Sequence, residues 1–517
     1  MTSENTNNSN NPPRDLNYSR VLDVHVWSCY KEVNEFVDLI YYAYFKDQNG
    51  KKSIAKRHIK LVLLDLYVAW LTDPNLNIAV TMTRDFYSKS FGTYDTRYNE
   101  LNISAKIVGV VHTLIKNGLI GYVKGKEGQE GYEQGHVSRI WAEPLLVSMF
   151  EKAAFHELMI WNEDNREVIV LRDYVEKIKG KKKAKAKAIP YDETEETQSQ
   201  RLVVQKYNEL LERTFIDVGE AETPVLTVEK KTSSKDLDKP HRVHITHKSK
   251  FTRRIFNNGS FAESGRFYGG FWQRIGEDYR KKILINDEET VELDFSSLHP
   301  VLAYATAGVD YWKEYRVGPY EIPVDGFNDS KAAREIIKKL LLLALNALDE
   351  EALFKAFRSE FDYSKLGDLK YKFTNDVLSK ILDSIKEKHP VITDQIATGA
   401  GTVLMNLDSK IVEFVIKRFL TTNTPVLSVH DSFIVQISQR DILLKAMKDA
   451  CIFVTGQTET KYKQNIPIYQ DAVAWRHLDF NYYLDAVAAL PKGQRRTTGY
   501  LNRLNKHKQF FKSKRLV

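Results

Sequence analysis

Two aspartates in the second half of the chain occupy positions from which they could bind metal ions. Asp294 ends a strand-like alternation of polar and apolar residues at 290–293, and Asp431 lies at the polar tip between two β-prone runs, 425–429 and 433–437. Carboxylates on adjacent strands can hold two Mg²⁺ ions roughly 3.5 to 4 Å apart, an arrangement that assists in-line phosphoryl displacement. Either aspartate alone is more often a turn or cap residue. The pair predicts nucleotidyl transfer.

A helix is expected between the two aspartates, over residues 331–347. It carries Arg334 and Lys338 one turn apart on one face. Such a face can hold a triphosphate by charge and hydrogen bonding, while the later turns press the nucleotide against a template base. The alternative is a solvated basic face on a core helix.

The order of these motifs resembles the family A polymerase superfamily, which includes family A DNA polymerases and single-subunit phage-type RNA polymerases. Asp294 with its flanks resembles motif A, and residues 430–433, His-Asp-Ser-Phe, resemble motif C as spelled in the RNA polymerases. Arg334, Lys338 and the eighth residue after that lysine match the spacing of motif B. Asn346 and the following alanine stand where the family usually has an aromatic residue and glycine. Residues 264–266 with Gln273 are similar to primer- and template-contacting elements, so the resemblance covers roughly residues 240–480.

The resemblance implies a role for each matching position. Its catalytic and metal-binding residues are Asp294 and Asp431, with Phe295 supplying its backbone carbonyl. The nucleotide-binding residues are Arg334, Lys338, His299 and Asn346, and the primer- or template-binding residues are Arg266, Gln273 and His430. The implied cofactor is Mg²⁺, as two ions that Mn²⁺ could replace, and the implied partners are a DNA primer-template and deoxynucleoside triphosphates.

His299 bears on the choice of sugar. It is the fifth residue after Asp294, where the resemblance places the side chain that faces the 2′ position of the nucleotide. A bulky ring there would clash with a ribose hydroxyl, which favours deoxynucleotides. The alternative is a structural histidine bonded to a backbone carbonyl.

Arginines and aromatic residues cluster just upstream of Asp294. Arg253, Arg254 and Arg266 accompany the aromatic pairs at 267–268 and 271–272. They predict a surface that binds a nucleic-acid backbone and stacks on bases. Aromatic residues in such runs are equally often part of a core.

The first half of the chain is expected to be mostly helical. Apolar residues recur at helical spacing in 31–44, 53–71 and 105–117, and the β-prone runs 119–123 and 137–142 flank a glycine-rich connection. Helix, strand, turn and strand in this order resemble a winged helix-turn-helix. Such domains bind DNA or proteins, and both remain open. The polar side chains offered to a DNA groove would be Ser104, Lys106, His112 and Lys116.

Composition limits the class of protein. The chain has 517 residues, of which 43% are hydrophobic and 28% charged, so it can bury real cores. Its two cysteines match no metal-ligand spacing, and no run approaches the roughly 18 apolar residues of a membrane span. We therefore expect a cytoplasmic protein without a membrane segment.

The net charge of +8 is concentrated in one place, because residues 492–517 carry nine Lys or Arg and no acid. With Tyr500, Phe510 and Phe511 this basic tail is expected either to lie along a phosphate backbone and stack on bases, or to be a solvated end.

We expect an α+β protein in which a polymerase palm and fingers domain follows a mainly helical winged-helix-like domain. The predicted parts are a disordered leader (1–20), the helical domain, which binds nucleic acid or a partner (21–160), a basic linker with a connecting helix (161–240), palm and fingers (241–490) and the basic tail (491–517).

The predicted function is template-directed DNA synthesis from a primer 3′ hydroxyl, without proofreading, by an enzyme of phage, plasmid or integrated-element type. Replication proteins are further candidate partners through the winged-helix-like domain. Two alternatives remain: an RNA polymerase or primase on the same palm, and a non-catalytic DNA-binding replication initiator.

Overall fold

The computed structural model describes residues 14–46, 51–91, 96–125, 137–174, 186–228, 241–315, 317–324, 330–366, 373–457, 468–470 and 495–514. Helices and strands are mixed throughout, so the predicted α+β class is confirmed. The chain divides into two compact units. Unit 1 comprises 1–166 with 246–248, and unit 2 comprises 167–245 with 249–517. No helix among the described residues is long and apolar enough to cross a bilayer.

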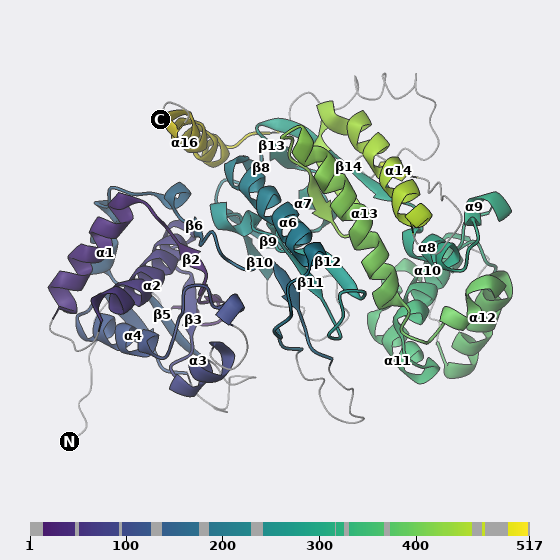
Figure 1. Ribbon diagram of the computed structural model, residues 1–517, viewed down its shortest axis with the longest axis horizontal. Coiled ribbons are helices and arrows are strands. Elements are labelled where there is room, and N and C mark those ends of the chain that lie inside the picture. The colour runs from purple at the N-terminus through teal and green to yellow at the C-terminus, as the bar shows by residue number, and fades with distance from the viewer. Residues whose placement is uncertain are drawn as a thin grey trace. The chain divides into compact units, whose positions relative to one another are not determined.

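Unit 1 packs helices against a small sheet (Figure 1). The sheet order is β1-β3-β5-β4, with β1 and β3 parallel and the other pairs antiparallel. The elements are β1 (Ser19–Val21), β2 (Val26–Trp27), α1 (Lys31–Tyr44), α2 (Lys52–Thr72), β3 (Asn77–Val80), α3 (Arg84–Phe91), α4 (Lys106–Lys116), β4 (Ile120–Val123), β5 (Ser138–Ala142), α5 (Pro144–Glu151) and β6 (Trp161–Asn162).

The expected helix-strand-turn-strand order is present in unit 1. Helix α4 ends at Lys116, and Gly118, with a φ of 67°, then turns the chain into β4, which pairs antiparallel with β5. The connection between the strands, 126–136, lies outside the described residues, as does most of the predicted leader. Residues 19 and 20 of that leader belong to β1, which pairs with β3.

Unit 2 contains the antiparallel sheet β15-β16-β14-β13-β8, and β17 pairs with the C-terminal end of β14. Its elements are β7 (Ile169–Leu171), α6 (Glu195–Arg213), β8 (Ile216–Val218), β9 (Val225–Val228), β10 (His241–His244), β11 (Arg253–Phe256), β12 (Ser264–Tyr268), α7 (Gly276–Arg280), β13 (Ile283–Ile285), β14 (Glu288–Phe295), α8 (Leu298–Thr306), α9 (Tyr311–Glu314), α10 (Ser330–Asn346), α11 (Glu350–Glu360), α12 (Asn375–Lys388), α13 (Gly401–Thr421), β15 (Leu427–Val429), β16 (Ser432–Gln436), α14 (Arg440–Gln457), β17 (Ile468–Gln470) and α16 (Thr498–Lys514).

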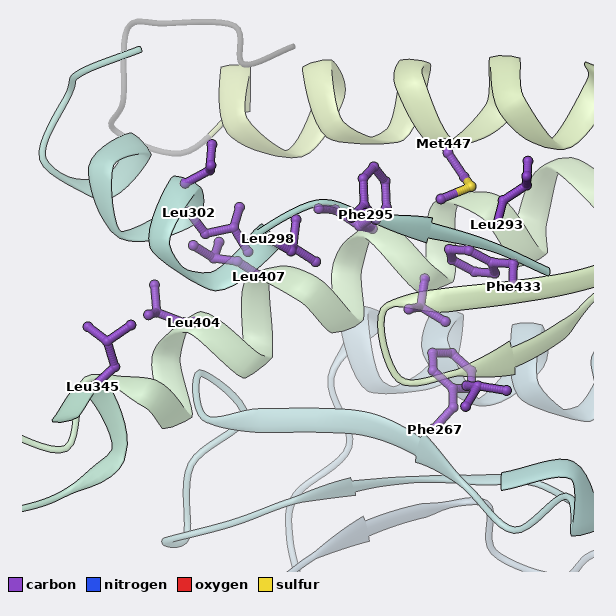
Figure 2. Close-up of a cluster of buried hydrophobic side chains, with 14 of the residues drawn as sticks. Phe267, Leu293, Phe295, Leu298, Leu302, Leu345, Leu404, Leu407, Phe433 and Met447 are labelled. Atoms are coloured by element: carbon purple, nitrogen blue, oxygen red, sulfur yellow. The ribbon is translucent and has the colours of Figure 1, made fainter. Parts of the chain in front are cut away.

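Helices α6, α13 and α14 lie side by side (Figure 1), with α13 packed on β12 and α14 packed on β14 and β16, and α10 packs with α11 and α12. Along β14 the side chains alternate, because successive residues of a strand point to opposite faces. Leu293 and Phe295 join Phe433 of β16 and Met447 of α14 in the core (Figure 2). The acidic residues between them, including Asp294, therefore lie on the other face.

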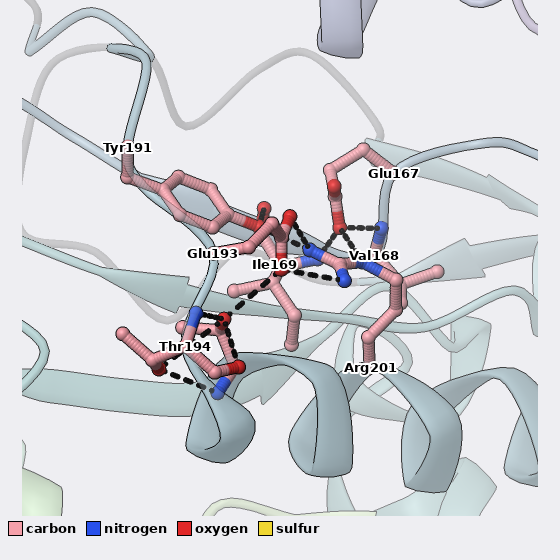
Figure 3. A network of polar contacts seen from close by, with 8 residues as sticks. Glu167, Val168, Ile169, Tyr191, Glu193, Thr194 and Arg201 are labelled. Atoms are coloured by element: carbon pink, nitrogen blue, oxygen red, sulfur yellow. Dashed lines mark hydrogen bonds and ion pairs between the residues drawn. The ribbon is translucent and has the colours of Figure 1, made fainter.

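The segment predicted as linker and connecting helix, 161–240, contributes β7, α6, β8 and β9 to unit 2. Helix α6 starts at Glu195 because Thr194 caps it: the Thr194 side chain accepts from the Thr197 backbone N–H at 3.1 Å. Arg201 then ties the helix start to Glu167, next to β7, with 3.1 Å between Nε and Oε1 (Figure 3). The Lys-rich part of the predicted linker, 175–185, lies outside the described residues.

The basic tail contains a folded helix, α16. Tyr500 and Leu504 are buried against Phe215 and Leu284 of the sheet. Phe510 is also buried, so the expectation that Tyr500 and Phe510 stack on bases is wrong. The apolar spacing within the helix is satisfied by packing on the sheet edge instead. Residues 491–494 and 515–517 lie outside the described part of the chain.

Candidate active site

The register of β14 against β16 brings the two predicted aspartates together. Asp294 is the direct partner of Ser432, and β15 and β16 are joined by the two-residue turn His430-Asp431. Directly opposed residues have Cα atoms about 4.5 to 5.5 Å apart. Asp431 is therefore one residue from the partner of Asp294, and both side chains are half-buried.

The turn that carries Asp431 is backbone-strained. His430 has a φ of 56°, in the left-handed region that non-glycine residues avoid. Ser297, three residues after Asp294 and directly before α8, has a φ of 57°. Such strain persists only where the surroundings enforce it, and it gathers at functional sites.

Side chains hold the carboxylate-bearing hairpin in place on the β14 side. The Ser432 hydroxyl donates to Glu292 Oε1 at 2.6 Å, and Arg280 Nε donates to Glu292 Oε2 at 2.9 Å. Glu292 lies two residues before Asp294, on the same face of the sheet. This chain of contacts fixes the hairpin tip relative to Asp294.

The outer edge of the hairpin is also covered. The backbone carbonyl of Ser428 in β15 accepts from Trp272 Nε1 and from Gln273 Nε2, both at 3.0 Å, and the carbonyl of Val426 accepts from the Tyr207 hydroxyl at 2.6 Å. These bonds satisfy edge-strand groups that would otherwise be open. Gln273, predicted to bind primer or template, thus uses its amide to hold β15, and it also donates to the carbonyl of Phe267.

Tyr320 connects both aspartates to the basic helix. Burial raises the pKa of Tyr320, a hydrogen bond to Ser297 opposes that rise, Asp431 and Asp294 add to it, and Arg334 lowers it. The charges of all three groups therefore act on the same phenol. The guanidinium carbon of Arg334, in α10, lies 5.5 Å from the centre of the Tyr320 ring. Two acids and a cation from three separate elements thus act on one buried side chain.

Helix α10 presents its other predicted residues to solvent. Lys338 is exposed one turn after the half-buried Arg334. Asn346, at the end of the helix, is exposed, and its Nδ2 donates to the Leu342 carbonyl at 2.7 Å. It lies against the start of α13, where a Cβ at Gly401 would come within 2.1 Å of Asn346 Oδ1. A side chain at 401 would therefore displace the Asn346 amide.

Arg266 and His299 share a buried carboxylate that the sequence interpretation did not assign. Arg266 Nε donates to Asp408 Oδ2 at 2.9 Å. His299 Nε2 lies 2.8 Å from that same oxygen and 2.8 Å from Arg266 Nη2. His299 therefore bonds to a side chain rather than to the backbone carbonyl considered above. The sugar-selecting role of His299 remains a prediction.

The group formed by Arg266, His299 and Asp408 acts electrostatically on the hairpin tip. Burial alone would lower the pKa of the Arg266 guanidinium, but the charge of Asp408 raises this pKa and the charge of Asp431 raises it further. Loss of water around the His430 ring and the charge of Arg266 lower the pKa of His430, with Asp431 opposing. The His430 ring also meets the Tyr268 ring edge-on, with 6.2 Å between centroids. Arg266 and His430 thus lie beside Asp431.

The expected surface around 253–272 is corrected by the structure. Arg254 is fully buried, and Phe267, Phe271 and Trp272 are buried with it. These side chains belong to the core, which was the alternative interpretation. Arg254 of β11 and Phe267 of β12 are direct partners and share one face of their sheet, whereas Phe271 and Trp272 follow β12 and are buried in the core of unit 2.

The donor set suits Mg²⁺. Among the described residues no group of three or more His, Cys, Asp or Glu is arranged to hold a metal ion. Asp294 and Asp431 would therefore supply two carboxylates, with substrate phosphates and water completing the shell. This division is usual for Mg²⁺, which prefers oxygen ligands and keeps several waters. The carbonyl of Phe295 stays a predicted third ligand.

Three contributors were missed from the sequence: Asp408, Tyr320 and Glu292. Asp408 left a signal, since it is an acid within the apolar face of a long helix and such a residue is seldom buried unless paired. Glu292 left a weaker one by sharing the face of Asp294 in the strand pattern. Tyr320 left none, because nothing in its neighbourhood indicates which residues it contacts.

Comparisons with known proteins add little. No protein-family model and no curated protein matches the chain. Among solved structures, the POL domain of Pol1 from M. smegmatis, in complex with DNA primer-template and dNTP, matches with a TM-score of 0.29 and 9% identity. The match covers 43% of this chain and 47% of that one, so it spans about half of that domain. A likeness this distant carries no conclusion about activity.

Proposed function

We propose that the chain is a template-directed DNA polymerase that adds deoxynucleotides to a primer 3′ hydroxyl. The observation that supports this most strongly is the meeting of Asp294 and Asp431 beside Tyr320 and Arg334. An antiparallel sheet that offers two half-buried acids, next to a helix with solvent-facing cations, is suited to binding a metal-bound triphosphate.

In the proposed reaction the primer O3′ forms a bond to the α-phosphorus of the nucleotide, and the bond between that phosphorus and the α–β bridging oxygen breaks. Pyrophosphate leaves with the electron pair, and the hydroxyl proton passes to water. Two divalent ions, when bound, would help ionise the hydroxyl and neutralise the phosphates. Asp294 and Asp431 hold these ions, and no side chain acts as a nucleophile.

The cations divide the remaining work. Arg334 and Lys338 are one turn apart on α10 and hold the β- and γ-phosphates. Arg266, fixed by Asp408, places a positive charge beside Asp431, where it balances the acid and contacts the primer end. Asn346 stacks beside or bonds to the incoming base from the last turn of α10.

Primer extension tests the proposal. A labelled DNA primer on a longer DNA template, with Mg²⁺ and the four deoxynucleoside triphosphates, should be extended to the template end. Asp294→Asn and Asp431→Asn should each reduce extension by at least about 10³-fold. Asp441→Asn is the matched control, because that aspartate lies in the first turn of α14 with its side chain 77% exposed.

Failure of the wild-type chain to extend with either Mg²⁺ or Mn²⁺, or full activity of either variant at the paired aspartates, would overturn the proposal. A parallel reaction with ribonucleotides addresses the alternative of an RNA polymerase or primase. The proposal expects deoxynucleotides to be preferred.

A further inference from the structure

A cavity of about 700 Å³ opens at the end of the unit 2 sheet that is opposite the two aspartates. It is lined by the last turn of α6, the turn between β13 and β14, the segment before β15, and one face of α16. The β13–β14 turn at Asn286 is eight residues from Asp294 along an extended strand, or about 25 Å. The cavity is therefore separate from the candidate active site.

Its walls are cationic. Arg213, Lys508 and Lys512 line it, and no carboxylate does so among the described residues. Beneath it, the buried Lys250 donates to the carbonyls of Glu212 and Thr214, at 2.9 and 2.8 Å. A concave site with cations of one sign attracts an anion more strongly than a flat surface does.

The acid that follows Asn286 in the chain is already engaged. Asp287 follows Asn286, accepts from Arg496 Nε at 2.7 Å and from the Tyr500 hydroxyl at 3.0 Å, and also interacts with Lys508. Its charge is therefore largely balanced by Arg496, and a net positive potential remains over the cavity.

His507 gives a second, independent sign of a ligand. This cavity-lining side chain is only 7% exposed, and its Nε2 has no hydrogen-bond partner among the described residues. A buried polar atom without a partner is unfavourable, and most such atoms in native proteins are satisfied. Burial and nearby Lys250 lower the pKa of His507 to about 3, so the ring is neutral and can exchange a hydrogen bond with a ligand.

Aromatic and amide groups stand beside the cations. The Phe511 ring lies 4.5 Å from the His507 ring, centre to centre, and is half-buried at the cavity wall. Asn286 and Asn423 supply amides, and Arg213 Nη2 donates to Asn423 Oδ1 at 2.6 Å. Rings that stack on bases and amides that meet base edges are the features by which proteins bind nucleotides.

The wall formed by α16 is firmly attached. Arg503 Nε donates to Asp217 Oδ2 at 2.7 Å, and Thr497 Oγ1 donates to the Ala221 carbonyl at 3.0 Å. Together with the buried Tyr500 and Leu504, these contacts fix the helix against β8 and its flanks. The cations are thus part of a built pocket and do not belong to a loose basic tail.

We infer that this pocket binds a nucleotide unit, with the phosphate against Arg213, Lys508 and Lys512 and the base against Phe511. The unit can come from a single strand of nucleic acid or from a free nucleotide, since both present a phosphate and a base. The pocket size is typical of small-ligand sites.

Binding of a fluorescent twelve-residue oligothymidylate and of dTTP, measured separately on the full chain in EDTA, tests the inference. The double variant Lys508→Gln/Lys512→Gln should bind at least one of the two probes about tenfold or more weakly. For the oligonucleotide, the slope of log K against log salt concentration should become less steep by about 1.4, because two phosphate contacts are lost. Phe511→Leu should also weaken binding while the salt dependence stays unchanged.

Lys506→Gln is the matched control, because Lys506 is exposed on the same helix and does not line the cavity. It should bind within about twofold of wild type. Loss of oligonucleotide binding alone in the double variant assigns the pocket to a strand, and loss of dTTP binding assigns it to free nucleotides; either result supports the site.

The inference is overturned if the double variant binds both probes like wild type, or if Lys506→Gln weakens binding as much as the double variant does. Measuring probe binding to the Asp294→Asn variant separates failure of this inference from failure of the proposed function. That variant should lose primer extension and keep the pocket.

Discussion

Two arginines on paired strands of unit 2 reach the same helix and have different surroundings. Arg254 of β11 contacts Glu413 of α13, with 2.5 Å between Nη1 and Oε2, and Arg266 of β12 contacts Asp408, one and a half turns earlier. Arg254 also donates to Ser409 Oγ and to the carbonyl of Gly265. Its donors end within the core.

Arg266 differs in which groups share its carboxylate. Asp408 also bonds to His299, and the charge of Asp431 acts on Arg266. A buried ion pair can therefore be a structural strut or the support of a reactive group, and residue type alone does not separate the two. The difference lies in which other groups contact the two paired side chains.

Replacing Arg254 should cost the most stability. Among the described residues, Arg254→Met leaves the Glu413 carboxylate with Lys417 as its one ionic partner, and breaking a buried pair costs about 3 to 5 kcal/mol. Urea unfolding followed by hydrogen exchange of α13 measures the loss. Primer extension by the folded fraction should change less than about threefold; a large specific loss of activity would erase the distinction between the two arginines.

Replacing Arg266 should instead act on activity. Arg266→Gln removes the positive charge beside Asp431, and we expect kcat/KM for extension to fall about 100-fold, or about 2.7 kcal/mol. His299 still bonds to Asp408, so the stability loss should be smaller than for Arg254→Met. Arg242→Gln, an exposed arginine of β10, is the control, and wild-type activity in Arg266→Gln would contradict the assignment.

The elements that carry these residues were largely predictable. The strand pattern indicated β14 with Asp294 at its end, and the hairpin with Asp431 at its tip was predicted from two short β-prone runs. Helix α10 with Arg334 and Lys338 followed from spacing. These signals are local, because each depends on residues close in the chain.

What the sequence could not resolve depends on distant partners. Arg254 and Arg266 were assigned to one surface, yet which of them is buried is decided by α13, some 150 residues later. Tyr320 and Asp408 acquire their roles only when separate elements meet. The basic tail forms α16 because Tyr500 packs against Phe215 and Leu284. No residue near 500 indicates these distant partners.

Lowering the pH should weaken the structural ion pair between Arg254 and Glu413. Burial opposes ionisation of Glu413, but Arg254 and Lys417 outweigh it and hold the pKa of Glu413 below its ordinary value of 4.5. The carboxylate therefore stabilises the fold above pH 4.5, and this stability is lost as the pH falls through the lowered pKa. Hydrogen exchange of α13 between pH 6 and 3 should show a steeper loss in wild type than in Arg254→Met. Equal slopes would mean that Arg254 does not set this pKa.

The smallest effect is expected at the rim of the same pair. Lys417 contacts Glu413 Oε1 at 2.7 Å but is 49% exposed. Lys417→Gln should therefore cost under about 1 kcal/mol, as exposed ion pairs do. A loss as large as that of Arg254→Met would show that the buried arginine is not the main partner.

The most direct test of the account is a double-mutant cycle on the two aspartates, with single-nucleotide incorporation as the readout. If Asp294 and Asp431 share the same divalent ions, each single change to asparagine removes most of the activity, by about 10³-fold or more. The double variant should then be no more than a few-fold worse than either single one. Full activity in either single variant, or losses that multiply in the double variant, would contradict a shared metal site.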